Sequence, residues 1–120
     1  MFRNVIMAAQ IAVVSLFCTT ALAEDAVTAD PGHYTVEFEN DKVRIIRVKY
    51  GPGEKSVMHT HGPNAWVVVD GGEMRMTLPD GSSGVEELEA GAIGWSDHDD
   101  HLPENLSDSS VEVVLVELKN

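Results

Sequence analysis

The sequence contains a single cysteine, Cys18, which lies within the first 23 of its 120 residues. The chain after residue 23 therefore contains no cysteine. This excludes disulfides, thiolate metal ligands and cysteine nucleophiles from that part of the protein. Basic residues are also scarce, because 8 Lys and Arg stand against 20 Asp and Glu, giving a net charge of −12. An acidic chain repels phosphate backbones and anionic lipid surfaces, so we expect neither nucleic acid nor a membrane surface as a partner.

Common catalytic and helical patterns are missing as well. The sequence contains no serine nucleophile motif, no glycine-rich phosphate loop and no zinc-protease motif. No window has a convincing helical period, and there is no internal repeat. The chemistry must therefore come from other residues, placed on a β-rich framework.

Residues 1–23 have the features of a secretory signal peptide. Arg3 supplies the positive charge, residues 5–22 are almost uninterruptedly apolar, and Ala21-Leu22-Ala23 matches a small-x-small cleavage site. We expect cleavage after Ala23 and a periplasmic or secreted protein, with seven basic against 20 acidic residues, a net charge of −13. An uncleaved membrane anchor is the alternative, because the apolar stretch is near the length of a membrane span.

The remaining chain, about 97 residues long, is enough for one domain. Residues 24–32 are small and polar, and we expect a flexible N-terminal segment there, with the folded domain over residues 33–120. β-Branched and alternating runs separated by turn signals predict strands at 34–38, 43–50, 56–61, 65–69, 73–78, 85–88, 92–95 and 111–118. Residues 97–105 are polar and are expected to form a loop. This regular spacing predicts an all-β fold, an antiparallel sandwich or barrel.

Two of the five histidines, His59 and His61, are separated by one residue on a predicted strand. Alternate residues of a strand face the same side, so both imidazoles point the same way. They can converge on one ion, at metal–nitrogen distances of about 2.0–2.1 Å. A His-x-His pair alone is a weak signal, and its surroundings decide its meaning.

The surroundings resemble the cupin family. The first cupin motif is a glycine, five residues, His-x-His, three or four residues, a glutamate, six residues and a glycine; the second ends in a histidine followed by an asparagine four positions later. The matching residues here are Gly53, His59, His61 and Gly72 for the first motif, and His101 and Asn105 for the second. The resemblance covers residues 43–118 and implies a cupin-like jelly roll with His59, His61 and His101 as metal ligands.

The chain departs from the cupin pattern in two places. Ala65 stands where the family has its glutamate ligand, and Gly91 lies one residue too near His101. Three neutral imidazoles would leave a divalent ion with its full charge, which suits Lewis-acid chemistry or binding of an anionic ligand. His98 is a possible fourth ligand, and the flanking Asp97, Asp99 and Asp100 could supply a ligand or a base instead, although a solvated acidic turn is the plainer interpretation of Asp99 and Asp100.

Strand alternation assigns the neighbouring side chains to two faces. The positions expected to line the interior with the histidines are Ala65, Val67, Val69, Met74 and Met76. Trp66 has the opposite parity and is expected outside, against another strand or a second subunit. Trp95 is expected in a pocket wall, and His33 is expected to be an exposed bystander.

These features predict a small secreted protein that holds one divalent transition metal, Fe, Mn, Ni, Cu or Zn, since imidazoles accept all of them. The leading expectation is a metal-dependent oxygenase, lyase or isomerase of a small molecule. The alternatives are a non-catalytic module that binds a small ligand or metal, and a structural cupin without a ligand. A sandwich this small leaves strand edges to be covered, and cupins commonly pair their sheets between subunits, so we also expect a homodimer.

Overall fold

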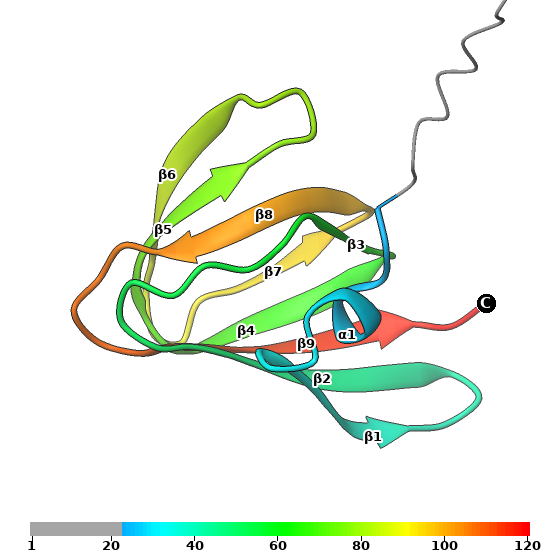
Figure 1. Ribbon diagram of the computed structural model, residues 1–120. Coiled ribbons are helices and arrows are strands. Elements are labelled where there is room, and N and C mark those ends of the chain that lie inside the picture. Colours follow the sequence, from blue (N-terminus) through cyan, green and yellow to red (C-terminus); the bar gives the residue numbers. More distant parts are fainter. Residues whose placement is uncertain (1–22) are drawn as a thin grey trace, which may run out of the picture.

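In a computed structural model of the protein, residues 23–120 are described, and they form antiparallel strands with one short helix (Figure 1). The signal peptide predicted over residues 1–23 lies almost wholly outside the described residues and stays a prediction. The elements are α1 (Ala26–Ala29), β1 (Tyr34–Glu39), β2 (Val43–Tyr50), β3 (His59–His61), β4 (Asn64–Asp70), β5 (Gly72–Thr77), β6 (Ser83–Leu88), β7 (Ile93–Ser96), β8 (Asp99–Asn105) and β9 (Val111–Leu118).

The strands form two sheets that lie over one another as layers (Figure 1). One sheet has the order β1-β2-β9-β4-β7 and the other β3-β8-β5-β6. The predicted antiparallel jelly-roll sandwich is therefore confirmed. The sheets do not close into a barrel, because each keeps two edge strands: β1 and β7 in one, β3 and β6 in the other.

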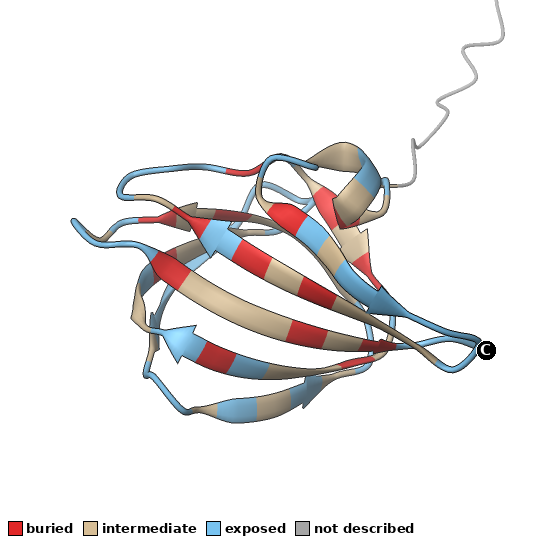
Figure 2. Ribbon diagram, turned by 90° about the horizontal axis from the view of Figure 1, so that it is seen from below, coloured by how far each residue is buried: buried red, intermediate tan, exposed pale blue. Residues whose placement is uncertain are grey.

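The hydrophobic core lies between the sheets and is built mainly from β2 and β9. These two strands, rich in β-branched residues, pair along their full length from Val43↔Leu118 to Tyr50↔Val111. Buried residues alternate with more exposed ones along the strands, as Figure 2 shows in red and paler colours. Ile46 and Val111 are among the most deeply buried side chains of this core.

The polar loop expected over residues 97–105 was wrong, because most of this segment is strand β8. It pairs with β3 on one side and β5 on the other. Its alternation is hidden in the sequence because the inward positions include Asp99, His101 and Asn105, which are polar. A strand whose inner face lines a polar site lacks the apolar period on which strand prediction depends.

The expected assignment of β4 side chains to the two faces was also wrong. β3 and β4 belong to different sheets, so the chain changes layer at Gly62-Pro63 and the parity of the histidines does not continue. Val67 and Val69 are 39% and 41% exposed, and Ala65 shares their outward face. Trp66 faces inward and packs over Gly94, where an added Cβ would collide with the indole.

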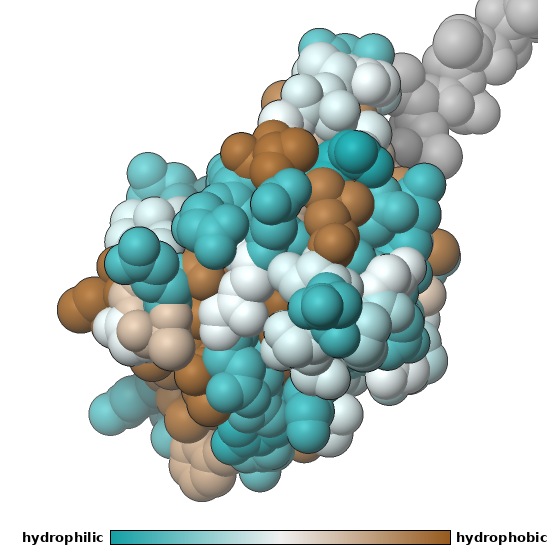
Figure 3. Space-filling view, turned by 90° about the vertical axis from the view of Figure 1, so that its left-hand side faces the viewer, coloured by the Kyte–Doolittle hydropathy of each residue, from teal (hydrophilic) through white to brown (hydrophobic). Residues whose placement is uncertain are grey.

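The N-terminal segment that we expected to be flexible contains α1 and packs against β1 and β3. Asp25 caps the helix, Ala26 is fully buried, and the amide of Thr60 donates to the carbonyl of Glu24 at 2.8 Å. No helix within residues 23–120 is long and apolar enough to cross a membrane. The end of the molecule seen in Figure 3 is mostly hydrophilic, with apolar side chains exposed in separate places.

Candidate metal centre

Three histidines meet where β3 pairs with β8. His59 lies directly opposite His101 in the register, and His61 is two residues further along β3 on the same face. Ring nitrogens of the three lie within 4.8 Å of one another, and the ring centroids are 4.8, 4.9 and 5.3 Å apart. The structure thus brings together the residues that the two cupin motifs single out, in an arrangement that could hold a metal ion.

The hydrogen bonds of the rings determine which nitrogens face the centre. His59 donates from Nδ1 to the carbonyl of Val57 at 2.8 Å, and His61 donates from Nδ1 to Glu117 at 3.1 Å. Their Nε2 atoms therefore carry lone pairs in the neutral rings, yet these two atoms lie only 3.0 Å apart. The third ring is that of His101, and its buried Nε2 has no hydrogen-bond partner among the described residues. A cation would satisfy all three rings, so the donor set fits a metal.

Burial keeps two of the imidazoles neutral. It lowers the pKa of His59 to about 4, assisted by the neighbouring His61. Burial also lowers the pKa of His101 to about 3, with further contributions from the charges that His61 and His59 would carry. Metal ions bind the neutral imidazole, so near neutral pH these two ligands need lose no proton before binding.

A chain of charged groups supports His61 from behind. Glu117 accepts from His61 and from Arg44, and Arg44 in turn donates to Asp25 at 2.5 Å. Burial raises the pKa of Glu117, but the hydrogen bonds from His61 and Arg44 outweigh it and hold that pKa below its usual value. The ionised carboxylate fixes the ring of His61 and makes it a better donor to a metal.

A second network supports His59. Ser56 donates to Asp30 at 2.6 Å and lies 3.3 Å from Nδ1 of His59. His33 was expected to be an exposed bystander, and this was wrong. Its side chain is 16% exposed, lies 2.8 Å from Asp30 and 3.1 Å from Glu54, and stacks on Tyr50 with ring centroids 4.7 Å apart.

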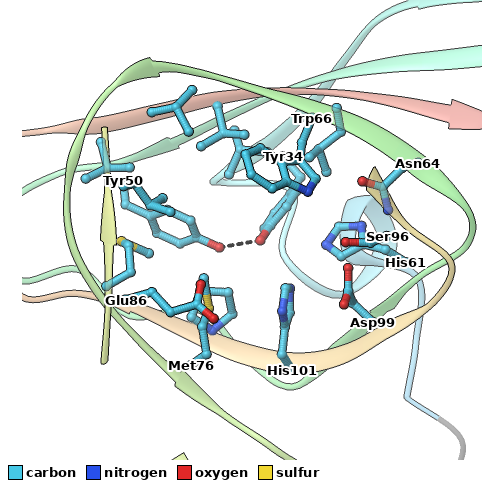
Figure 4. Close-up of a pocket in the computed structure, with 18 of the residues that line it drawn as sticks. Tyr34, Tyr50, His61, Asn64, Trp66, Met76, Glu86, Ser96, Asp99 and His101 are labelled. Atoms are coloured by element: carbon cyan, nitrogen blue, oxygen red, sulfur yellow. Dashed lines mark hydrogen bonds between the residues drawn. The ribbon is translucent and has the colours of Figure 1, made fainter. Parts of the chain in front are cut away.

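A cavity of about 450 Å³ opens in front of the centre (Figure 4). His61 and His101 line it, whereas His59 is fully buried behind them. Its other walls are mainly apolar and aromatic: Val48, Trp66, Val68, Met74, Met76, Leu78, Leu88, Trp95, Val111, Val113 and Leu115. Met74, Met76 and Trp95 lie where the sequence predicted them, although Trp95 remains half-exposed. Ala65, Val67 and Val69 do not line the cavity.

Five polar residues of the cavity wall were not predicted from the sequence: Tyr34, Tyr50, Asn64, Glu86 and Ser96. Tyr34 and Tyr50 are each 3% exposed, and their hydroxyls are hydrogen-bonded to one another (Figure 4). Burial raises the pKa of both phenols, so both remain protonated. The tyrosines come from β1 and β2 and lie outside both cupin motifs, so no motif links them to the site.

The possible fourth ligand, His98, lies at the cavity but outside the group of converging nitrogens. Its side chain is 62% exposed and lies 3.1 Å from the carboxylate of Asp100. Asp99 is the register partner of His61 and points into the cavity beside it (Figure 4). A carboxylate therefore stands near the centre, supplied by β8 and not by position 65.

The fold is similar to that of solved cupin structures. A cupin domain from Bordetella pertussis Tohama I is 25% identical over 72% of this chain and 92% of its own, with a TM-score of 0.67. An RmlC-like cupin from Methanocaldococcus jannaschii is 21% identical over 72% of this chain and 80% of its own, with a TM-score of 0.56. The polyketide cyclase RemF from Streptomyces resistomycificus is 15% identical over 82% of this chain and 75% of its own, with a TM-score of 0.58. No family model and no curated protein matches the sequence.

These likenesses, together with the two motifs, identify the chain as a cupin by fold. The resemblance predicted from His59, His61 and His101 is thereby confirmed, and the same three residues form the cluster that could hold a metal ion.

Proposed function

We propose that the protein binds one divalent transition metal through His59, His61 and His101 and uses it on a small molecule in the cavity. The observation that carries this proposal is the buried Nε2 of His101, which has no hydrogen-bond partner within residues 23–120 and lies near two further ring nitrogens only 3.0 Å apart. Such an arrangement is unfavourable without a positive charge between the rings.

The walls of the cavity indicate what kind of molecule it accepts. When bound, the ion would supply Lewis-acid or redox chemistry at the inner end. The walls around it are largely apolar and exclude water, and the lining residues of the described chain include no Lys or Arg. Glu86, Asp99 and Asp100 line the same cavity. We therefore infer a small, mainly apolar substrate that carries no anionic tail and contacts the ion through one polar end.

The reaction class that this arrangement supports is that of an oxygenase, a lyase or an isomerase acting on an oxygenated molecule. The alternative is a binding module that captures such a molecule without converting it, which the predominantly apolar lining also favours. Incubation of the metal-loaded protein with a panel of apolar oxygenated compounds separates the two. Turnover supports the enzyme, whereas stoichiometric binding without product supports the module.

The metal site itself is tested by elemental analysis of protein purified from its native compartment. His59→Ala, His61→Ala and His101→Ala should each lose the ion, because removing a ligand weakens binding more than the roughly 10–100-fold effect of removing a supporting residue. His98→Ala is the matched control and should retain it, since His98 lies outside the converging group. Metal retained in His101→Ala would contradict the site.

We also propose that the protein acts outside the cytoplasm, beginning at Glu24 after removal of its leader. The support is the apolar leader and its Ala-x-Ala end. Mass spectrometry of protein from the periplasm or medium should find residues 1–23 absent. A chain that keeps them and stays in the membrane fraction would contradict this.

A further inference from the structure

Two tyrosine hydroxyls lie at the inner end of the cavity, next to the metal centre. The hydroxyl of Tyr34 lies 3.1 Å from Nε2 of His59 and within hydrogen-bond distance of the hydroxyl of Tyr50. Figure 4 shows both phenols pointing into the cavity on the side that His101 faces. Tyr34 also lines the cavity, so a molecule that reaches the histidines meets this hydroxyl.

The direction of the hydrogen bonds made by Tyr34 and Tyr50 follows from which atoms carry a proton. Nε2 of His59 is an acceptor, because Nδ1 of the same ring donates to Val57. Without a metal, Tyr34 therefore donates to His59, and Tyr50 donates to Tyr34. A metal ion uses the same lone pair of His59, and Tyr34 then loses its acceptor. Its proton becomes available to whatever atom lies beside the ion.

We propose that the hydroxyl of Tyr34 donates a hydrogen bond to the molecule bound at the metal, and that Tyr50 positions Tyr34 for this. The proposal rests on the proposed metal site and adds a requirement on the ligand. The ligand must offer an acceptor atom, such as an oxygen, next to the atom that contacts the ion. Oxygenated molecules with two adjacent oxygens meet this requirement, whereas a ligand with a single donor atom does not.

The packing around Tyr34 holds the hydroxyl in place. Tyr34 lies on β1, opposite Val48 of β2, and its ring packs edge-on against His59 with centroids 4.8 Å apart. Tyr50 packs edge-on against Tyr34 at 6.0 Å and is stacked on His33. A donor fixed before the ligand arrives loses little conformational freedom on binding, which is what a recognition group needs.

The test uses Co²⁺-loaded full-length protein, with acetohydroxamate as the probe and imidazole as the control ligand, both followed by Co²⁺ absorption. Acetohydroxamate offers a second oxygen, and imidazole offers no acceptor beside its metal-bound nitrogen. Tyr34→Phe should weaken acetohydroxamate binding about 10-fold or more, since hydrogen bonds to charged groups are the stronger ones. Affinity for imidazole should stay within about 2-fold of that of the unmodified protein, and affinity for Co²⁺ should be equal or higher, because the ion no longer displaces the hydrogen bond from Tyr34 to His59.

Tyr50→Phe is the matched variant. It also removes a phenol hydroxyl, but one that contacts the hydroxyl of Tyr34 and not the ligand itself. It should weaken acetohydroxamate binding by a smaller factor, about 2–5-fold, and it provides an independent test if Tyr34→Phe does not fold. Unchanged acetohydroxamate affinity in both variants would overturn the role of Tyr34, and so would an equal loss of both ligands or a loss of Co²⁺ in Tyr34→Phe. Failure of the unmodified protein to bind Co²⁺ would overturn the metal site itself, which is a distinguishable result.

Discussion

Within the centre, two of the imidazoles use one ring nitrogen to hold their position and present the other to their neighbours. Val57 and Glu117 accept from the outer nitrogens of His59 and His61. The two supports differ in charge, because Val57 offers a neutral carbonyl and Glu117 an ionised carboxylate. The two rings are therefore unequal ligands, and that of His61 is the more electron-rich.

Substitutions at positions 64 and 65 should differ in their effect on metal affinity. From the sequence, Ala65 stands at the cupin glutamate and a glutamate there would be expected to tighten metal binding. In the structure, Ala65 faces away from the cavity, whereas the adjacent Asn64 is 2% exposed and lines it. Ala65→Glu should therefore leave metal affinity within about 2-fold, while Asn64→Asp should tighten it, because a carboxylate in the cavity offsets part of the ion's charge.

Competition with a coloured chelator measures both variants. A tighter Ala65→Glu protein would mean that β4 presents its other face to the ion. Circular dichroism serves as the control, because Asn64 also donates to the carbonyl of Gly62 at 2.8 Å and its loss could disturb the turn.

At the scale of the elements, the site depends on strands that carry no ligand. β9 contributes Glu117, β2 contributes Arg44, and the cap of α1 contributes Asp25. Strands β2 and β9 belong to the sheet opposite β3 and β8, whereas Asp25 bridges Thr60 of β3, so the metal site joins the two layers of the sandwich. Binding at the centre should consequently be sensitive to changes in the opposite sheet.

Glu117→Gln tests this dependence. The amide can still accept from His61 but has no charge, and Arg44 loses one of its two carboxylate partners. We expect metal affinity to fall about 10-fold, at the lower end of the range for supporting residues. Glu112→Gln is the matched control, because Glu112 lies on the same strand and pairs with Arg47 and Lys49 on the outside.

Chelator titrations of the two variants give the comparison. Equal affinities in Glu117→Gln and the unmodified protein would mean that the carboxylate only pairs with Arg44. A similar loss in Glu112→Gln would attribute the effect to strand β9 as a whole and not to the contact with His61.

The elements that sequence patterns could predict are those that bury apolar side chains in regular alternation. β2 and β9 are predicted to the residue, because both are β-branched and pair along their full length. β8 could not be predicted, since Asp99 and His101 occupy inward positions that are apolar in an ordinary strand.

The three histidine ligands were predictable because the spacing of the motifs fixes them. Tyr34 and Glu117 were not, because only the packing of β1 and β9 places them there.

At the scale of the whole molecule, the buried histidines make stability depend on pH. The pKa values of His59 and His101 are lowered to about 4 and about 3, against 6.5 in an unfolded chain. The unfolded state thus binds more protons between pH 6.5 and 3, and the stability of the metal-free protein falls as pH drops through that window. The raised pKa of His33 acts in the opposite direction.

The measurement is urea unfolding of chelator-treated protein at pH 7.5 and at pH 5. The free energy of unfolding should be lower at pH 5 by on the order of 2 kcal/mol for each of the two rings, since pH 5 lies about 1.5 units below 6.5 and each unit is worth about 1.4 kcal/mol. His101→Asn should reduce this difference, and His98→Ala should leave it unchanged. A protein that is equally stable at both pH values would show that the buried rings take up protons without cost.

The association state is the other property of the whole molecule, and we propose that the protein is a homodimer. Its edge strands leave backbone groups unpaired, and apolar side chains are exposed on the outer face of β4 and β7. Val67 and Ile93 are register partners there, 39% and 75% exposed. Trp66 does not contribute to this surface, because it faces the cavity.

Light scattering at micromolar concentration should therefore give the mass of two chains. Ile93→Lys should shift the protein to a monomer, because a charge placed in an apolar interface is buried without a partner. Leu118→Lys is the control, since Leu118 is also exposed, at 48%, but lies at the end of β9. A monomeric mass for the unmodified protein would exclude the dimer, and a dimer that survives Ile93→Lys would exclude this face. If the dimer does form through β4 and β7, it covers the strand that carries Trp95, and association would then narrow the opening of the cavity beside the three histidines.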